Sequence, residues 1–462
     1  MDELEERPER GSQEVGMNGR KPGKTAPGRG LAGVWMVVAL VCCAPVQWLW
    51  AEPLSPSPVD PTRIGVLLPL SGRFAPVGEE VRRGMELALE QQAPSPMGPF
   101  TVVYRDTKDD PALTEQAVHE LVEEEHVVAI IGPLVSATVD AAAIAAAELE
   151  VPLVILSQKR DVPFLGNYVY RNFMTLEFQV RTLVAYAMDV LELRRFAIVY
   201  PQQRYWMEAA ALFWDEVVAR GGEIRGVESY PPGTKDFLEV ARKLGRKYYL
   251  DLRRQELEEG TRQMREAYRK AGREPPKKPY ELPPIVDFDA VFVPDQYGAA
   301  ALLAASLAYA EFPVGKFAPD KKQTPVRLLG TSAWNSPDFI LQGGDYVEGC
   351  LFVDNFFSQS PDPVVRAFVG EFQRVHGRKP EIFAAVGYDS VALLCSLLRA
   401  RPLDRAGLLR RLSTMKGFSG ATGTIAFDDH GELKKELFVI TVHRERFEQL
   451  VPAPEQPETD GG

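Results

Sequence analysis

Three serines stand directly after apolar runs that predict β-strands. Ser71, Ser136 and Ser157 each follow such a run, and Ser136 also stands at the predicted start of a helix. Open parallel sheets bind ligands beyond the carboxyl ends of their strands, so the three hydroxyls are expected on one rim. Backbone N–H groups at a helix start favour an anion there, although Ser136 could equally be an ordinary helix cap.

Positive charge follows the third of these serines. Lys159 and Arg160 come two and three residues after Ser157. Ammonium and guanidinium groups make charge-assisted hydrogen bonds with anionic oxygens. The rim therefore suits an anionic or polyhydroxylated ligand, or it binds none.

Patterns typical of catalysis and metal binding are missing from the sequence. The five histidines stand without a second histidine or a carboxylate at metal-ligand spacing. The chain has no serine-hydrolase elbow, phosphate-binding loop or dinucleotide-binding turn. The paired acids Asp109-Asp110 and Asp428-Asp429 lie in predicted turns, where aspartate bonds to the backbone. We expect no enzyme, metal site or cofactor.

Composition narrows the classes of partner. The 462 residues carry 53 Lys and Arg against 64 Asp and Glu, a net charge of -11. This balance, without a basic stripe, argues against nucleic acid or an anionic membrane surface as the main partner. Cys350 and Cys395 lie in apolar segments and Cys42 and Cys43 in the N-terminal apolar run, which predicts no disulfide framework.

The N-terminus resembles a secretory signal. Residues 31–51 are almost all apolar and follow four basic residues, so we expect residues 1–51 to be a signal peptide or a membrane anchor. Lipidation at Cys43 is the weaker alternative. A proline-rich linker, residues 52–61, comes next. The protein is therefore expected in the periplasm or cell envelope.

Alternation of short β-branched runs with alanine-rich, helix-period segments predicts an α/β fold with parallel sheets. The pattern begins near residue 62 and restarts near residue 193, which indicates two lobes. The first lobe is expected to have strands at 64–70, 101–105, 127–131 and 151–156, and helices at 79–91, 113–124 and 139–148.

The second half of the chain continues this alternation. Residues 247–284 interrupt it with dense charge and repeated prolines, which predicts a solvated helical insertion. The tail at 448–462 is expected to be disordered. Further strands are predicted at 196–200, 223–230, 289–293, 327–330 and 348–353, helices at 208–220, 299–310 and 382–399, and a hairpin of 423–427 with 437–443.

These segments resemble type I periplasmic binding proteins, the family of the leucine/isoleucine/valine receptors. The resemblance spans about residues 62–445 and implies two Rossmann-like lobes with hinge crossovers, 62–178 with 354–415 and 179–353 with 416–447. It implies a receptor that closes on a small ligand for an ABC transporter or a sensor. It rests on Ile64 to Gly72, Gly78, Arg83-Gly84, Ile131-Gly132-Pro133, Val151-Pro152, Arg171, Gly387-Tyr388-Asp389 and Gly423 to Phe427.

The resemblance also implies roles for single residues. Ser136 matches the serine that holds the carboxylate of an amino-acid ligand, Ser157 a second rim position, and Tyr205 a tyrosine of the second lobe. Lys159 stands in place of a usual threonine, and Ala299 in place of the acid that pairs with the ligand ammonium. A buried ammonium without a partner costs several kcal/mol. A small anionic ligand is therefore expected rather than a neutral amino acid.

A narrower resemblance implies a different function. It is to lipoprotein activators of penicillin-binding proteins, which share the two-lobe fold and contact a peptidoglycan synthase. The segments that carry it are Tyr170 to Phe173, Glu228 to Gly233, Asp287 to Ala290 and Leu329 to Asn335. The alternative function is therefore regulation of peptidoglycan synthesis through protein contacts. The expected partner is an ABC permease or a peptidoglycan synthase.

Overall fold

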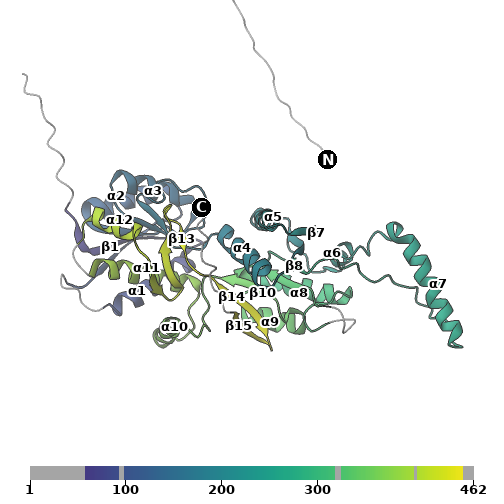
Figure 1. The fold of residues 1–462 in the computed structure, drawn as a ribbon. Coiled ribbons are helices and arrows are strands. Elements are labelled where there is room, and N and C mark those ends of the chain that lie inside the picture. The colour runs from purple at the N-terminus through teal and green to yellow at the C-terminus, as the bar shows by residue number, and fades with distance from the viewer. Residues whose placement is uncertain (1–57, 93–97, 318–323, 400–402, 451–462) are drawn as a thin grey trace, which may run out of the picture. The chain divides into compact units, whose positions relative to one another are not determined.

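The computed structural model describes residues 58–92, 98–317, 324–399 and 403–450 (Figure 1). The signal or anchor predicted at 1–51 lies outside these residues, as do Cys42 and Cys43. Within them the prediction of an α/β fold with two parallel-sheet lobes is confirmed. The linker prediction is wrong at its end, because the first strand already begins at Asp60.

The first sheet is entirely parallel, with strand order β2-β1-β3-β4-β5. β3 is buried along its whole length, as expected for a strand covered by helices on both faces. The strands are β1 (Asp60–Leu68), β2 (Thr101–Asp106), β3 (Val127–Ile131), β4 (Leu153–Ile155) and β5 (Val169–Arg171).

Helices from both ends of the chain complete this half. Gly84 of α1 and Gly387 of α11 let the two backbones approach closely, since a Cβ at either would overlap the carbonyl oxygen of Ala384 or Val81. Side chains of α11 and α12 join the core cluster that contains Ile64. The helices are α1 (Ala75–Glu90), α2 (Pro111–His119), which ends in a π-helical turn (Glu120–Glu124), α3 (Val139–Glu148), α11 (Ile382–Arg399) and α12 (Arg405–Ser413).

The second sheet has seven strands in the order β15-β14-β10-β9-β8-β6-β7. β14 and β15 run antiparallel to their neighbours, and the remaining pairs are parallel. The strands are β6 (Arg195–Pro201), β7 (Glu223–Tyr230), β8 (Ala290–Phe292), β9 (Arg327–Gly330), β10 (Leu351–Asp354), β14 (Phe438–His443) and β15 (Arg446–Leu450).

Among the described residues, five helices lie in the segments around the second sheet, whereas α10 contacts α11 of the first half through Phe368 and Tyr388. α4, α6, α9 and α10 were not predicted, although a side-chain cap opens three of them, at Thr175, Ser336 and Asp362. The helices are α4 (Leu176–Ala185), which ends in a π-helical turn (Tyr186–Val190), α5 (Arg204–Ala219), α6 (Leu238–Leu244), α8 (Tyr297–Tyr309), α9 (Pro337–Gly343) and α10 (Pro363–His376).

The end of the chain differs from the predictions in two ways. The predicted hairpin of 423–427 with 437–443 is wrong, because β12 (Gly423–Phe427) pairs with β11 (Phe418–Gly420) and with β13 (Leu433–Lys434). The tail prediction is wrong for residues 448–450, which belong to β15 and pair with β14.

This small three-stranded sheet packs with the first half of the molecule. Ile425, Phe427 and Leu433 lie in the same core cluster as Ile64 of β1. For β11 to β13 this packing differs from the predicted assignment of residues 416–447 to the second lobe. β14 and the first two residues of β15 follow that assignment, since both strands join the second sheet.

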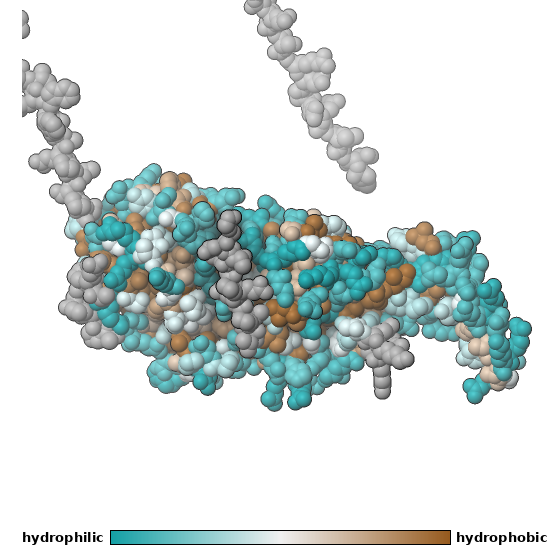
Figure 2. Space-filling view, in the orientation of Figure 1, coloured by the Kyte–Doolittle hydropathy of each residue, from teal (hydrophilic) through white to brown (hydrophobic). Residues whose placement is uncertain are grey.

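The charge-dense insertion forms a helix, as predicted. α7 (Arg254–Lys270) follows a short 3-10 turn (Leu250–Arg253) and has no buried residue. Figure 2 shows hydrophilic residues over most of its visible face.

One described helix, α11, is long and apolar enough to cross a membrane by length and composition alone. Its most apolar window is 67% buried within the protein. This burial matches its contribution to the core beneath the first sheet.

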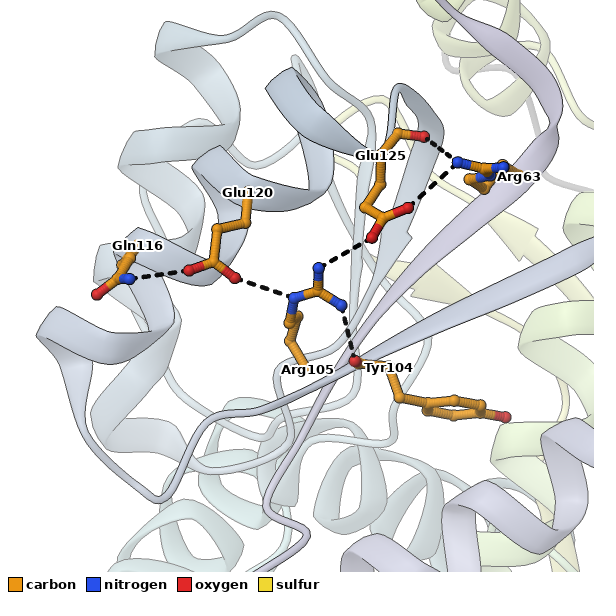
Figure 3. A network of polar contacts seen from close by, with 6 residues as sticks. All are labelled: Arg63, Tyr104, Arg105, Gln116, Glu120 and Glu125. Carbon is orange, nitrogen blue, oxygen red and sulfur yellow. Dashed lines mark hydrogen bonds and ion pairs between the residues drawn. The ribbon is translucent and has the colours of Figure 1, made fainter.

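At one edge of the first sheet, ion pairs connect strands β1 and β2 to the residues after α2 (Figure 3). Arg105 of β2 contacts Glu120 at 3.0 Å and Glu125 at 3.1 Å. Arg63 of β1 contacts the other carboxylate oxygen of Glu125 at 3.2 Å. Every charged side chain in this network has an opposite charge beside it, so the π-helical turn after α2 is held against strands β1 and β2.

Candidate functional site

A cavity of ≈ 1210 Å³ is lined by segments from both predicted lobes. Its wall includes Ser136, the loop after β4, the connection from β5 into α4, the start of α5, and residues around β13. Lys159 and Tyr205 also line it. Three of the five predicted binding residues are therefore brought together at one cavity.

Ser157 lies behind this wall and positions its neighbours. It is 2% exposed, and its Oγ lies 3.3 Å from Ser136 Oγ. The same oxygen accepts a hydrogen bond from the Lys159 backbone N–H at 3.3 Å. Ser136 begins a 3-10 turn (Ser136–Thr138) that leads into α3, as its predicted position at a helix start requires.

Lys159 already has an anionic neighbour. Its Nζ lies 3.2 Å from Asp140 Oδ2 in the first turn of α3. Asp140 is exposed enough to be solvated when Lys159 turns away, since its side chain retains 49% of its accessible surface. A ligand anion at Lys159 would therefore compete with this carboxylate.

Contacts connect the loop after β4 to α5. Arg160 Nε lies 3.1 Å from Glu208 Oε1, and the Tyr205 hydroxyl donates to Gln158 Oε1 at 3.4 Å. Burial, with a smaller contribution from Glu208, raises the pKa of Tyr205, so the phenol stays neutral and can donate. Its ring packs edge-on against Trp206 at 4.7 Å between centroids.

Arg171 is a buried cation in the wall that sequence reasoning had placed only within a family motif. Its side chain is 2% exposed, its Nε lies 2.7 Å from Glu432 Oε2, and its Nη1 donates to the Ser157 carbonyl oxygen. The Arg171 backbone N–H donates to Gly431 O at 2.9 Å. Gly431 has φ 73° and lies against the backbone of Gly166, where a Cβ would not fit. The turn before β13 is thereby held at the cavity.

A second charged group of the cavity wall is centred on Lys435. Its Nζ donates to the Thr422 carbonyl oxygen, and burial lowers its pKa to about 7 against the opposing attraction of Asp389 and Asp354. Burial raises the pKa of Asp354 to about 6 despite a 2.8 Å hydrogen bond from Asn335. Burial also raises the pKa of Asp389, which accepts hydrogen bonds from Ala421 and Thr422.

Two further residues with a possible role inferred from the sequence do not line the cavity. Ser71 is exposed in the turn after β1 and is not among the residues that line the cavity. Ala299 lies in α8 and packs against the core cluster of the second sheet. No role for Ser71 follows from this position, and its part in binding stays a prediction.

Cations outnumber acids in the wall. Seven lysines and arginines line the cavity against five aspartates and glutamates; of the seven, Lys435 is only partly protonated at neutral pH because its pKa is about 7. Arg204 and Lys434, both exposed, have no carboxylate within ion-pair distance among the described residues. The described ranges also contain no group of three His, Cys, Asp or Glu residues that could hold a metal ion. The wall can thus attract an anion without a metal.

A model of one protein family matches most of this chain. It is described as periplasmic binding protein and matches residues 61–247 and 318–446. The comparison with curated proteins finds no match.

Solved structures share the fold. One is a putative branched-chain amino acid ABC transporter from Rhodospirillum rubrum, with 23% identity, TM-score 0.66, and coverage of 84% of this chain and 99% of that one. Another is a branched-chain amino acid substrate-binding protein from Streptococcus pneumoniae in complex with isoleucine, with 20% identity, TM-score 0.56, and coverage of 86% and 100%. A third is a solute-binding protein from R. palustris in complex with benzoate, with 18% identity, TM-score 0.54, and coverage of 84% and 95%.

Proposed function

Because the chain belongs to the periplasmic binding protein family, which is non-enzymatic, we propose that it is an exported receptor for a small organic anion. The surplus of cations in the cavity wall carries this proposal. Family membership implies a location outside the cytoplasm. Delivery of the ligand to an ABC permease is part of the proposal.

The rest of the wall suggests the kind of anion. Phe173, Phe178, Leu165 and Leu433 line the cavity with Tyr205. Such a wall removes an apolar body from water, at about 25 cal/mol for each Å² of apolar surface. A carboxylate on an aromatic or aliphatic body combines both features, and the similar R. palustris protein was solved in complex with benzoate. We therefore propose an aromatic or aliphatic carboxylate as the ligand class.

Within this proposal Ser136 and Lys159 bind the carboxylate. The Ser136 hydroxyl and the amides of the turn that it begins supply neutral donors at the cavity. Lys159 would exchange Asp140 for the ligand, and a hydrogen bond to a charged group contributes about 1.5–3 kcal/mol.

Calorimetric titration tests the ligand class. Benzoate is expected to bind, and benzyl alcohol, the uncharged molecule of similar shape, at least about tenfold more weakly. Leucine, which carries an ammonium, is expected to bind poorly. Tight binding of leucine, or equal binding of benzoate and benzyl alcohol, would contradict the proposal.

One substitution tests the site. Lys159→Ala is expected to weaken binding of the carboxylate about ten- to a hundredfold at almost unchanged thermal stability. Lys416→Ala removes an exposed lysine that does not line the cavity and is the matched control. Equal affinities of the two variants for the carboxylate would show that Lys159 does not bind the ligand.

The second candidate function is regulation of peptidoglycan synthesis through protein contacts. One observation favours it: helix α7 has no buried residue and lies between the two segments matched by the family model. The comparisons give no support to the narrower activator branch. If no carboxylate raises the thermal midpoint, the receptor proposal fails and this candidate gains support.

A further inference from the structure

Helix α7 is a long helix with little packing of its own. Its 17 residues include none that is buried, and it lies in the part of the chain that the family model does not match. Helices of about this length are only marginally stable in water without tertiary packing. We propose that α7 pairs antiparallel with α7 of a second copy of this chain, making the protein a dimer.

Three large apolar residues and one threonine form a stripe along α7. The spacing of these four residues is the same when it is read from either end of the helix. Leu257, Thr261, Met264 and Tyr268 follow one another at intervals of four, three and four residues. This spacing places them on one helix face, as in a coiled-coil seam. In an antiparallel pair Leu257 lies opposite Tyr268 of the second copy, and Thr261 opposite Met264 of the second copy. A twofold axis midway between Thr261 and Met264 therefore gives every residue of the stripe a partner from the second copy.

The distribution of charge along α7 favours antiparallel over parallel pairing of the two helices. The first half of α7 carries three acids against Arg254, and the second half carries four bases against Glu266, so the first half is net acidic and the second net basic; the acids are Glu256, Glu258 and Glu259, and the bases are Arg262, Arg265, Arg269 and Lys270. Antiparallel pairing sets each acidic half beside a basic half, while parallel pairing sets like charges together. Glu258 and Arg265 flank the stripe on the same side and meet across the twofold axis. Such flanking charges decide partner and orientation in coiled coils.

One flank of the stripe is open and the other is covered. On the open side, a groove of ≈ 560 Å³ is lined by α7 residues alone, among them Leu257, Glu258 and Arg265. On the covered side, the ring of Tyr280 from the returning chain packs onto Gly260, where a Cβ would overlap it. The chain's own packing thus leaves free the flank that carries the complementary charges.

The residues just before α7 add exposed apolar side chains to the half-buried stripe of Leu257, Thr261, Met264 and Tyr268. Tyr249 is 61% exposed and Leu252 is 85% exposed. In the antiparallel pair the end of the second copy's helix, with Arg269 and Lys270, reaches this region. Cations over aromatic faces add attraction there.

Disulfide trapping in the full chain tests the register. Thr261→Cys and Met264→Cys are made separately in a Cys42→Ser, Cys43→Ser background, and the two proteins are mixed under mild oxidation in mild detergent. The mixed disulfide is expected to dominate over either homodisulfide, because only the 261–264 pair brings the Cα atoms within about 7 Å. A dominant Thr261→Cys homodisulfide, or no disulfide at all, would overturn the proposal.

Charge reversal with rescue tests the interface independently of any ligand. Sedimentation of the full chain in mild detergent is expected to show a dimer that Glu258→Arg weakens at least about tenfold. Arg265→Glu should weaken it similarly, and the double variant should restore it. Glu259→Arg makes the same charge change on the opposite face and is expected to leave the dimer intact. A monomer at every concentration, or no rescue by the double variant, would contradict antiparallel pairing.

Discussion

The ion pairs at the edge of the first sheet and the charged groups beside the cavity use the same residue types in different surroundings. In the network of Figure 3, Arg105, Glu120 and Glu125 retain between 27% and 31% of their side-chain exposure. Beside the cavity, Arg171 retains 2%.

The exposure of a charged side chain decides how much its ion pair contributes to the stability of the protein. Water already solvates exposed charges, so pairing them stabilises a protein by about 0–1 kcal/mol. A buried charge that loses its partner stays without solvation, which costs about 3–5 kcal/mol. Substitutions in the two regions should therefore differ severalfold in their effect on stability.

The largest effect is expected at Arg171. Glu432→Ala leaves the guanidinium of Arg171, whose side chain is 2% exposed, buried without its carboxylate. The free energy of unfolding is expected to fall by about 3 kcal/mol, measured by urea denaturation.

Glu177→Ala is the matched control for this substitution. Arg181 also lines the cavity and contacts Glu177 at 2.7 Å, but its side chain is 57% exposed. The loss of this exposed pair should cost no more than about 0.5 kcal/mol. Similar losses in the two variants would remove burial as the deciding factor.

An intermediate, pH-dependent effect is expected at Lys435. Burial depresses its folded pKa from 10.5 to about 7, so its contribution to stability is complete above pH 10.5 and is lost as the pH falls through about 7. Relative to Lys435→Met, the wild-type protein should therefore gain stability from pH 7 to pH 9, by about 1 kcal/mol per pH unit.

The neighbouring Lys434 supplies the control. It is exposed, so Lys434→Met should follow the wild-type pH dependence in the same urea titrations. A wild-type curve that runs parallel to that of Lys435→Met over this range would show that Lys435 titrates as an ordinary lysine.

The smallest effect is expected in the partly exposed network of Figure 3. Arg105→Met should cost about 0.5–1 kcal/mol at low ionic strength and less in about 1 M salt, where exposed charges are screened. Urea denaturation at both salt concentrations measures this difference. A salt-independent loss of about 3 kcal/mol would mean that this network behaves like the buried pair.

Sequence reasoning found the elements whose signals are local. β3, β7, β9 and α11 have the predicted bounds, because β3 and β9 contain short apolar runs, β7 alternates polar and apolar residues, and α11 has a long helical period with clear ends. Ser136 and Lys159 line the cavity because they follow strands β3 and β4. The Asp362-Pro363 start of α10 was an available signal that went unused.

Contacts between distant segments could not be predicted in this way. β5 has only three residues, and its Arg171 is partnered by Glu432, far along the chain. The pairing of Lys159 with Asp140 depends on how α3 packs beside the loop after β4. The wrong hairpin has the same origin: β12 and β14 look like neighbours in sequence, yet their pairing partners lie in different sheets.

The position of β14 in the second sheet has a consequence for biosynthesis. Leu351 of β10 pairs with Thr441 of β14, so this edge is completed only by residues from the end of the chain. During synthesis or export, β10 remains an unpaired edge strand until β14 emerges. An unpaired edge is a template for pairing with other chains, and distant pairing is slow. The nascent protein therefore needs protection from aggregation until β14 has been released.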